Sequence, residues 1–354
     1  MYSNLFLISL VCTVNSVVQS LYMFGSPPPP PPIWDKVSSG LKKRSRDWFI
    51  GRAERAGIPW QAVTDIYKDT GIFYKCVHHK NNIENRELRY PSYFTKQFHG
   101  YDKGNMNWQA AFEAEAATLS ISANYWKDVD PFTSEQWLRN NITDRIITYR
   151  NLHDIIEPPT HILDIGCSIG VSTEFLKSNY KDAHVWGVDL SPYFLAVAAF
   201  RTERFNRKIN YVHANAEKIP FSDNSMDIVT MNFLLHEVPT EPTINMLNEV
   251  MRVLKPGGTL HIVDLEPTQL KSTLSASPFR KWAFEVTEPH IYEYYKNSMT
   301  ETLISCGFHN IVKYKNDPLN SMWCAIKKDN QEYFLSTVTE EPSSNTHILV
   351  SQSM

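Results

Sequence analysis

The chain has 354 residues, a formal net charge of −3 and 42% hydrophobic residues. This length suffices for two domains, or for one large domain with a cap, around a well-buried core. Without a basic excess, a nucleic-acid partner is disfavoured. The five cysteines are unevenly spaced and include no C-x-x-C pair. We therefore expect reduced thiols and no structural metal.

The N-terminal region has the composition of an address segment. Residues 1–24 are largely apolar, but the uninterrupted apolar run Leu5–Val14 is short for a membrane span. This pattern predicts a secretory signal or the signal half of a bipartite organelle address; the alternative is an apolar helix of the mature fold. The prolines Pro27–Pro32 predict a stiff polyproline II spacer, and the basic run Lys42–Arg46 is typical of a transit segment or a solvated linker.

A helical region is expected before the first strand, and one helix in it combines apolar side chains with a carboxylate. Trp108, Phe112, Glu115 and Leu119 fall at i, i+4, i+7 and i+11, so they share one helix face. A buried acid needs a partner or a catalytic task. We hypothesise that Glu115 faces an active-site mouth; the alternative is a satisfied structural carboxylate. Glu113, off this face, is expected to be solvated.

The stretch Ile162–Ser172 organises the rest of the chain. A short apolar run ends in a glycine turn that reads Asp164-x-Gly166-x-Ser168-x-Gly170, and an amphipathic segment follows it. This order predicts strand, tight turn and helix, with free N–H groups at the helix start. The spacing matches neither G-x-G-x-x-G nor a P-loop, which disfavours a dinucleotide or a nucleoside triphosphate.

Strands and helices alternate from residue 160 onward, which predicts a parallel sheet with crossover helices. Asp189 ends the second strand, 23 residues after Gly166, where a carboxylate can accept both hydroxyls of a ribose. The fourth strand ends at Asn232 and is followed by His236. His236 is the best candidate for a general base by residue type, and a pocket-wall role is the alternative.

Three motifs together resemble class I S-adenosylmethionine-dependent methyltransferases of type 11. They are the glycine turn, the segment Val188–Pro192 and the turn Leu-Lys-Pro-Gly-Gly at 254–258. The resemblance covers about residues 160–327. Four further segments, Gly100–Glu113, Leu190–Val197, His213–Glu217 and Thr287–His290, resemble a plant-chloroplast and cyanobacterial-type group whose acceptors are undefined. This narrower likeness covers 98–327. Ser168 departs from the family, which has glycine there.

The resemblance implies a Rossmann-like, seven-stranded α/β sheet, mostly parallel with the last strand antiparallel, and an N-terminal helical cap. It also implies S-adenosyl-L-methionine as cofactor, with the methionine end near Asp164 and Gly166, the ribose at Asp189, and the adenine near Leu190 and Ala216. The full predicted cofactor set is Asp164, Gly166, Cys167, Ser168, Gly170, Asp189, Leu190, Asn215, Ala216 and Asn232. On the acceptor side we predict His236, Glu115 and Tyr292, and no metal ligand.

We predict an address segment with spacer at 1–46, a helical cap region at 47–157, a cofactor-binding domain at 158–328 and a polar tail at 329–354. The predicted function is methyl transfer to a small apolar or aromatic molecule. The alternative is a non-catalytic protein of the same fold that binds or regulates. The expected location is a plastid, with the secretory pathway as the alternative. No nucleic acid and no stable membrane span after processing are expected, and the oligomeric state is left open.

Overall fold

The computed structural model describes residues 46–95, 101, 103–123, 125–126, 128–275, 277–278, 281, 284–285, 288–328 and 339–340. The predicted address segment, the polyproline spacer and nearly all of the predicted polar tail lie outside these residues. Among the helices that are described, none combines the length and the apolar character that a membrane span requires.

The fold is built on one twisted sheet, with the strand order β3-β2-β1-β4-β5-β7-β6-β8. Its strands are β1 (His161–Ile165), β2 (His184–Asp189), β3 (Asn210–His213), β4 (Met226–Asn232), β5 (Leu254–Leu265), β6 (Phe308–Lys315), β7 (Asn320–Lys327) and β8 (Thr339–Glu340). The first five strands pair in parallel, and β7 runs antiparallel to both β5 and β6. The predicted fold class is thus confirmed; the two-residue β8 is an addition at the edge.

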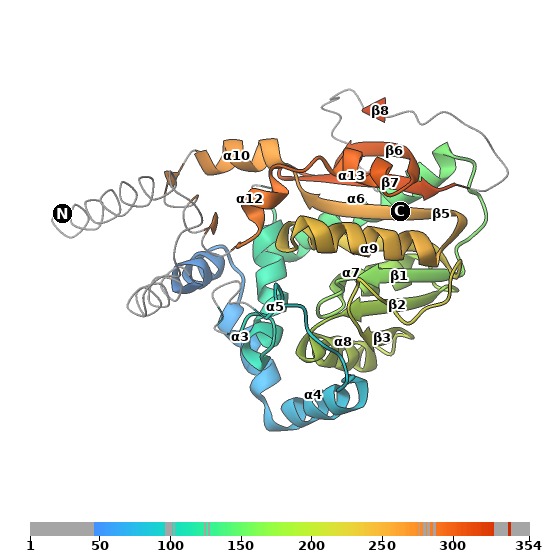
Figure 1. Cartoon of the computed structure of the whole chain (residues 1–354). Helices are drawn as coiled ribbons and strands as arrows, with labels where there is room; N and C mark the ends of the chain where they lie inside the picture. The colour runs from blue at the N-terminus through green and yellow to red at the C-terminus, as the bar shows by residue number, and fades with distance from the viewer. Residues whose placement is uncertain are drawn as a thin grey trace, which may run out of the picture. The chain divides into compact units, whose positions relative to one another are not determined.

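Helices cover both faces of this sheet (Figure 1). The helices after the first strand are α7 (Val171–Asn179), α8 (Pro192–Arg204), η1 (Leu235–Glu237), α9 (Thr240–Val253), α10 (Pro267–Ser275), α12 (Ile291–Tyr294) and α13 (Met299–Ser305). Side chains of α9 and α13 pack on one face, with Leu163, Val229 and Leu260. Side chains of α7 pack on the other, with Ile162 and Val185.

The region predicted as a helical cap contributes to two different layers. Its helix α6 (Pro131–Leu152) places Leu138, Ile142 and Ile146 against the sheet, on the same face as α7. This helix begins at Pro131, because Asp130 accepts hydrogen bonds from the first turn and Pro131 suits the first helical position. It therefore forms part of the sheet domain's core.

The remaining helices of this region form a cap beside α8. They are a helix over 46–55, α3 (Trp60–Lys68), α4 (Thr70–Ile83) and α5 (Trp108–Ser122). Phe112 of α5 stacks on Tyr67 of α3 with 5.4 Å between ring centroids, and both rings pack in a cluster with Phe200 of α8. The cap is thus joined to the sheet domain by a continuous apolar interface.

The topology places the candidate site at one edge of the sheet. The chain passes outward from β1 through β2 to β3 and then returns to β4 on the other side of β1. Ligands of open α/β sheets bind at such a reversal, outside the carboxyl ends of the strands. Here the reversal lies between β1 and β4, so the residues after these two strands face the same crevice.

Candidate cofactor and acceptor site

The turn after β1 contains three residues in the left-handed region. The φ angles are +70° at Gly166, +49° at Ser168 and +81° at Gly170. Side chains with a Cβ are strained there, whereas glycine is not. This geometry explains why the family resemblance calls for glycine at 168, and it makes Ser168 the strained residue of the turn.

The two glycines also lie against neighbouring side chains. A Cβ at Gly166 would come within 2.9 Å of Leu234 Cδ2, and a Cβ at Gly170 would overlap the phenol of Tyr211. Leu234 belongs to the segment after β4, so that segment packs directly on the glycine turn. The turn is therefore shaped by close packing as well as by backbone conformation.

Asp164 is buried, with an exposed fraction of 1%, and side chains donate to both of its oxygens. Ser172 and Thr173 donate to Oδ2 at 2.6 and 2.7 Å, while Thr230 and the Asn232 amide donate to Oδ1 at 2.7 and 3.3 Å. Hydrogen bonds of this kind stabilise an ionised carboxylate in a buried place. Asp164 thus fixes the start of α7 and the end of β4, and it orients Asn232.

The side-chain oxygen of Asn232 is available to accept a hydrogen bond from a ligand. Its Nδ2 is used by Asp164, and its Oδ1 is buried and accepts no hydrogen bond from the residues that the structure describes. A buried acceptor without a donor costs free energy, and a ligand ammonium group would satisfy it. This acceptor fits the ammonium group at the methionine end of S-adenosylmethionine, with the charge of Asp164 directly behind the amide.

Asp189 ends β2 and lies beside the turn. Its Oδ2 accepts the Ser168 N–H at 2.9 Å, and its Oδ1 accepts the Ser191 N–H at 2.7 Å. Burial raises the pKa of this carboxyl to about 6, although the two N–H groups lower it. Each oxygen keeps a second lone pair, so the carboxylate can still accept hydrogen bonds from two ribose hydroxyls.

The residues predicted for the adenine lie after β2 and β3. Leu190 and Ala216 are buried, and Cys167 in the turn is buried as well. Asn215 Oδ1 accepts the Glu217 N–H at 3.0 Å, and its amide lies 3.3 Å from the Glu217 carboxylate. All ten predicted cofactor residues thus lie at the carboxyl ends of β1, β2 and β4 or in the turns that follow β1, β2 and β3.

His236 lies in η1, just after the segment that packs on the glycine turn. Its Nδ1 is 2.6 Å from Asp264 Oδ1, and Asp264 is fully buried at the end of β5. Burial lowers the pKa of the imidazole, but the carboxylates of Asp264, Glu237 and Glu288 together outweigh burial and raise the pKa from 6.5 to about 10. A protonated imidazole cannot accept a proton, so this environment argues against the predicted role of general base.

Both acids on α5 have structural partners in the fold. Glu113 was expected to be solvated, and this expectation is wrong: it is buried and bonded to Arg46, Tyr101 and Gln109. Glu115 is half-buried, 2.9 Å from the Tyr67 hydroxyl and 2.8 Å from Arg201.

Glu115 therefore does not lie with His236. Arg201 is nine residues beyond the start of α8 at the crevice edge, about 14 Å along the helix at 1.5 Å per residue. The contacts of Glu115 are those of the structural carboxylate that the sequence left as the alternative.

Tyr292 is an exposed ring on α12, edge-on to Tyr295, and this is the only way in which it reaches the acceptor side.

Two functional candidates, Asp264 and Thr230, were not identified from the sequence. Asp264 carried the same signal as Asp164 and Asp189, namely an acid at the end of an apolar strand. Thr230 carried none, because a threonine within a strand is ordinary.

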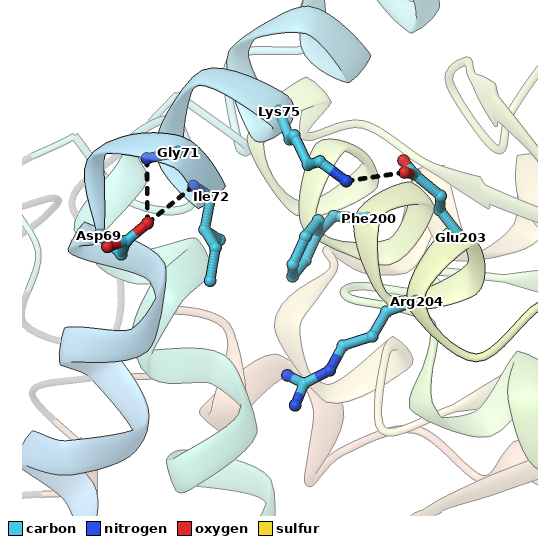
Figure 2. A pocket seen from close by; sticks show the side chains of 7 residues that line it. All are labelled: Asp69, Gly71, Ile72, Lys75, Phe200, Glu203 and Arg204. Atoms are coloured by element: carbon cyan, nitrogen blue, oxygen red, sulfur yellow. Dashed lines mark hydrogen bonds and ion pairs between the residues drawn. The ribbon is translucent and has the colours of Figure 1, made fainter.

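A surface hollow of about 380 Å³ lies between α4 and α8, away from the carboxyl ends of the strands. Figure 2 shows its lining, in which Lys75 points to Glu203 and Asp69 caps the first turn of α4. Lys75 and Glu203 are thus paired with each other, and the Asp69 carboxylate is used by the start of α4, so most of the polar groups of the hollow are already engaged.

Comparisons with known proteins agree with this geometry. Residues 162–258 match the family model described as a methyltransferase domain. Over 111 residues the chain is 35% identical to demethylmenaquinone methyltransferase of Listeria monocytogenes, which covers 31% of this chain and 46% of the relative. The enzyme of the same name from Bacillus licheniformis is 38% identical over 108 residues, which cover 30% of this chain and 44% of the relative.

The chain thus spans less than half the length of the curated relatives it matches. Among solved structures, phosphoethanolamine N-methyltransferase 2 of Haemonchus contortus in complex with S-adenosyl-L-methionine aligns with a TM-score of 0.48 and 18% identity, over 68% of this chain and 61% of that one. The sheet order, the glycine turn and the family match agree. Residues 162–258 thus match a methyltransferase domain, and the chain resembles S-adenosylmethionine-dependent methyltransferases of class I.

Proposed function

We propose that the protein transfers a methyl group from S-adenosylmethionine to a small apolar or aromatic molecule. The observation that carries this proposal is the left-handed turn between Gly166 and Gly170, placed between the acids Asp164 and Asp189. Acids at both strand ends suit a cationic ligand with a ribose, and they would repel a pyrophosphate. The family match over 162–258 supports the same cofactor.

The cofactor supplies a methyl group on a positively charged sulfur that is a good leaving group. The chain's own residues then have to bind, orient and exclude water. Asn232 Oδ1 would accept from the ammonium group, Asp189 from the ribose, and Leu190 and Ala216 would enclose the adenine. The acid behind Asn232 adds attraction for the positive end of the ligand.

His236 has no proton-accepting task in this proposal. Its hydrogen bond to Asp264 holds it as a donor, and its main-chain N–H also points to Asp264 Oδ2, at 3.3 Å. It therefore helps to fix the wall of the crevice after β4. An acceptor that carries an acidic proton would have to lose it to another group or to water.

Two observations support an apolar, aromatic methyl acceptor. Aromatic side chains gather around α12, where Tyr292 is exposed and Tyr295 and Phe284 are half-buried. The names of the two relatives above specify demethylmenaquinone as their acceptor. An apolar, aromatic acceptor is consistent with both.

Calorimetric titration of the purified full chain tests the proposal. We expect S-adenosylmethionine to bind and NAD to give no heat of binding. Asp189→Ala should weaken S-adenosylmethionine binding by at least about tenfold, since two charge-assisted hydrogen bonds would be lost. Unchanged affinity in a folded Asp189→Ala sample would show that Asp189 does not hold the ribose.

A turnover assay separates the enzyme from a non-catalytic protein of the same fold. The chain is incubated with S-adenosylmethionine and a panel of quinones, phenols and aliphatic hydroxyl compounds, and release of S-adenosylhomocysteine is measured. Acceptor-dependent release supports methyl transfer. Tight binding of the cofactor with no release on any acceptor would favour the binding or regulatory role.

A further inference from the structure

A cluster of one histidine and two glutamates lies beside the proposed site. One ligand atom each from His236, Glu237 and Glu288 can be chosen so that all three lie within 4.8 Å of one another. His236 and Glu237 belong to η1, and Glu288 lies just before α12. These residues come from segments about 50 positions apart, which the fold brings together.

The imidazole in this cluster is oriented as a metal ligand would be. His236 Nδ1 lies 2.6 Å from Asp264, which is fully buried and also accepts the main-chain N–H of Leu235 at 2.7 Å. A carboxylate that holds one ring nitrogen fixes the ring and leaves the other nitrogen for the metal. That other nitrogen, Nε2, lies 4.0 Å from Glu237 Oε1, on the side of the two glutamates.

Negative groups gather around the imidazole of this cluster. The carboxylates of Asp264, Glu237 and Glu288 all act on His236, so three negative groups surround one imidazole. His236 and Glu288 are buried, with exposed fractions of 8% and 5%, and the Glu237 side chain is 21% exposed. Three carboxylates gathered this closely around one ring nitrogen would attract a doubly charged cation.

We propose that His236, Glu237 and Glu288 form a binding site for one divalent transition-metal ion, which fastens the segment before α12 to η1. A bound ion at about 2.0–2.2 Å from each ligand would draw the three donor atoms to about 3–3.5 Å from one another, a shift within reach of side-chain rotation. The ion would take the place of the Nε2 proton. A nitrogen ligand with two carboxylates suits Zn²⁺ or Mn²⁺ better than Mg²⁺ or Ca²⁺, which prefer oxygen ligands.

Such an ion would act on the wall of the crevice. Leu234 packs on Gly166 and directly precedes η1, and Tyr294 of α12 donates its hydroxyl proton to the Leu265 carbonyl at 2.7 Å. Joining η1 to the segment before α12 would therefore fix both sides of the acceptor region. The inference concerns metal binding alone, and it stands or falls independently of methyl transfer.

The test is titration of the full chain, without a polyhistidine tag and after removal of metals with EDTA. Calorimetry with ZnCl₂, MnCl₂ and MgCl₂ should show one site for Zn²⁺ or Mn²⁺ that is at least about tenfold tighter than any Mg²⁺ site. The midpoint of thermal unfolding should rise with the bound ion, because the ion binds only the folded chain.

Two variants and one control locate the site. Glu288→Gln and Glu237→Gln should each weaken Zn²⁺ or Mn²⁺ binding by at least about tenfold, since each removes a charged ligand. Glu241→Gln, an exposed acid four residues after Glu237, should bind as the parent does. If Glu288→Gln does not fold, the less buried Glu237→Gln gives the answer.

Either of two results would overturn the proposal: no stoichiometric binding of Zn²⁺ or Mn²⁺ by the folded parent chain, or equal affinities in the Glu237→Gln, Glu241→Gln and parent proteins. The cluster would then be an ion-pair network around a protonated His236. The same samples are also titrated with S-adenosylmethionine. Binding of S-adenosylmethionine without binding of Zn²⁺ or Mn²⁺ would contradict the metal site and leave the proposed function intact.

Discussion

Two pairs of carboxylates in this molecule lie in different kinds of surroundings. Asp164 and Asp189 end neighbouring strands, and their partners come from the turn and strands beside them. Glu113 and Glu115 lie on α5, and their strongest partners are Arg46 and Arg201, which are 67 and 86 positions away in the chain. The first pair could be placed from the sequence, whereas the second could not.

The difference follows from how each pattern encodes position. A strand followed by glycines fixes the backbone locally, so an acid at its end must lie at the carboxyl edge of the sheet. A helix pattern tells which residues share a face, but it does not tell what that face contacts. Helix α5 is covered on more than one side, since Phe112, Glu113 and Ala116 are all buried. The helix pattern therefore predicts a solvated Glu113, whereas the structure buries it.

The largest expected effect comes from breaking the ion pairs between α5, α7 and α8. Arg201 lies 3.0 Å from Glu174 and 2.8 Å from Glu115, and it is nearly buried. Arg201→Met should lower the free energy of unfolding by about 3–5 kcal/mol, because it leaves Glu174 buried with only the 3.5 Å contact from Arg207. Chemical denaturation followed by circular dichroism measures this loss.

Glu115→Gln is the matched variant for that measurement. An amide of the same shape keeps the Tyr67 hydrogen bond and removes only the charge, so we expect a loss of about 1 kcal/mol. Its affinity for S-adenosylmethionine should be unchanged. A Glu115→Gln protein that unfolds normally but loses turnover would restore Glu115 to the acceptor side and remove the contrast between the two pairs.

A second prediction concerns the packing of the glycine turn. Gly170→Ala should lower the free energy of unfolding by about 3 kcal/mol, because the new Cβ meets Tyr211 and the left-handed backbone is strained. Gly257→Ala is the control: its φ is +75°, but no atom lies within 4 Å of the added carbon. It should cost only about 1–2 kcal/mol. Equal losses would mean that the turn is shaped by backbone strain and not by packing.

The third prediction uses the raised pKa of Asp189, about 6 in the folded chain and 3.8 in the reference state. The ionised carboxylate accepts hydrogen bonds from both ribose hydroxyls, and the protonated form offers fewer acceptors. Affinity for S-adenosylmethionine should therefore fall as the pH drops below about 6, by up to about tenfold per pH unit. The raised pKa also means that this group's contribution to stability declines as the pH rises from 3.8 to 6.

Calorimetric titrations with S-adenosylmethionine between pH 5 and 8 check how the affinity depends on pH. Asp189→Asn should bind weakly at every pH and should lack the fall near pH 6. A parent chain with constant affinity across this range would show that the ionisation of Asp189 is not coupled to the cofactor.

Much of the sheet and of the cofactor side could be predicted from the sequence. Apolar runs, strand-end acids and glycine spacing are local signals, and they located Asp164, Asp189 and Asn232. The acceptor side could not be predicted in the same way. The state of His236 depends on Asp264, 28 residues away, and the cluster that includes Glu288 requires α12 to be placed on η1. No spacing rule relates residues that meet only after the chain has folded.

The smallest expected effect concerns Ser168, where the resembling family has glycine. It tests whether local backbone conformation alone determines the turn at this residue. Ser168 has φ +49°, a conformation that destabilises a residue with a Cβ by about 1–2 kcal/mol. Glycine is not strained there, but it loses up to about 1 kcal/mol of chain entropy on folding. Ser168→Gly should therefore raise the free energy of unfolding by about 0.5–1 kcal/mol. Asp154→Gly, at φ +55° on the exposed surface, should gain less, because aspartate tolerates this region better. Only Ser168→Gly should change the affinity for S-adenosylmethionine, since it alters the backbone freedom of the turn whose N–H at 168 orients Asp189. A gain of stability in both variants with no change in affinity in either would mean that the serine costs the fold free energy without affecting the ligand.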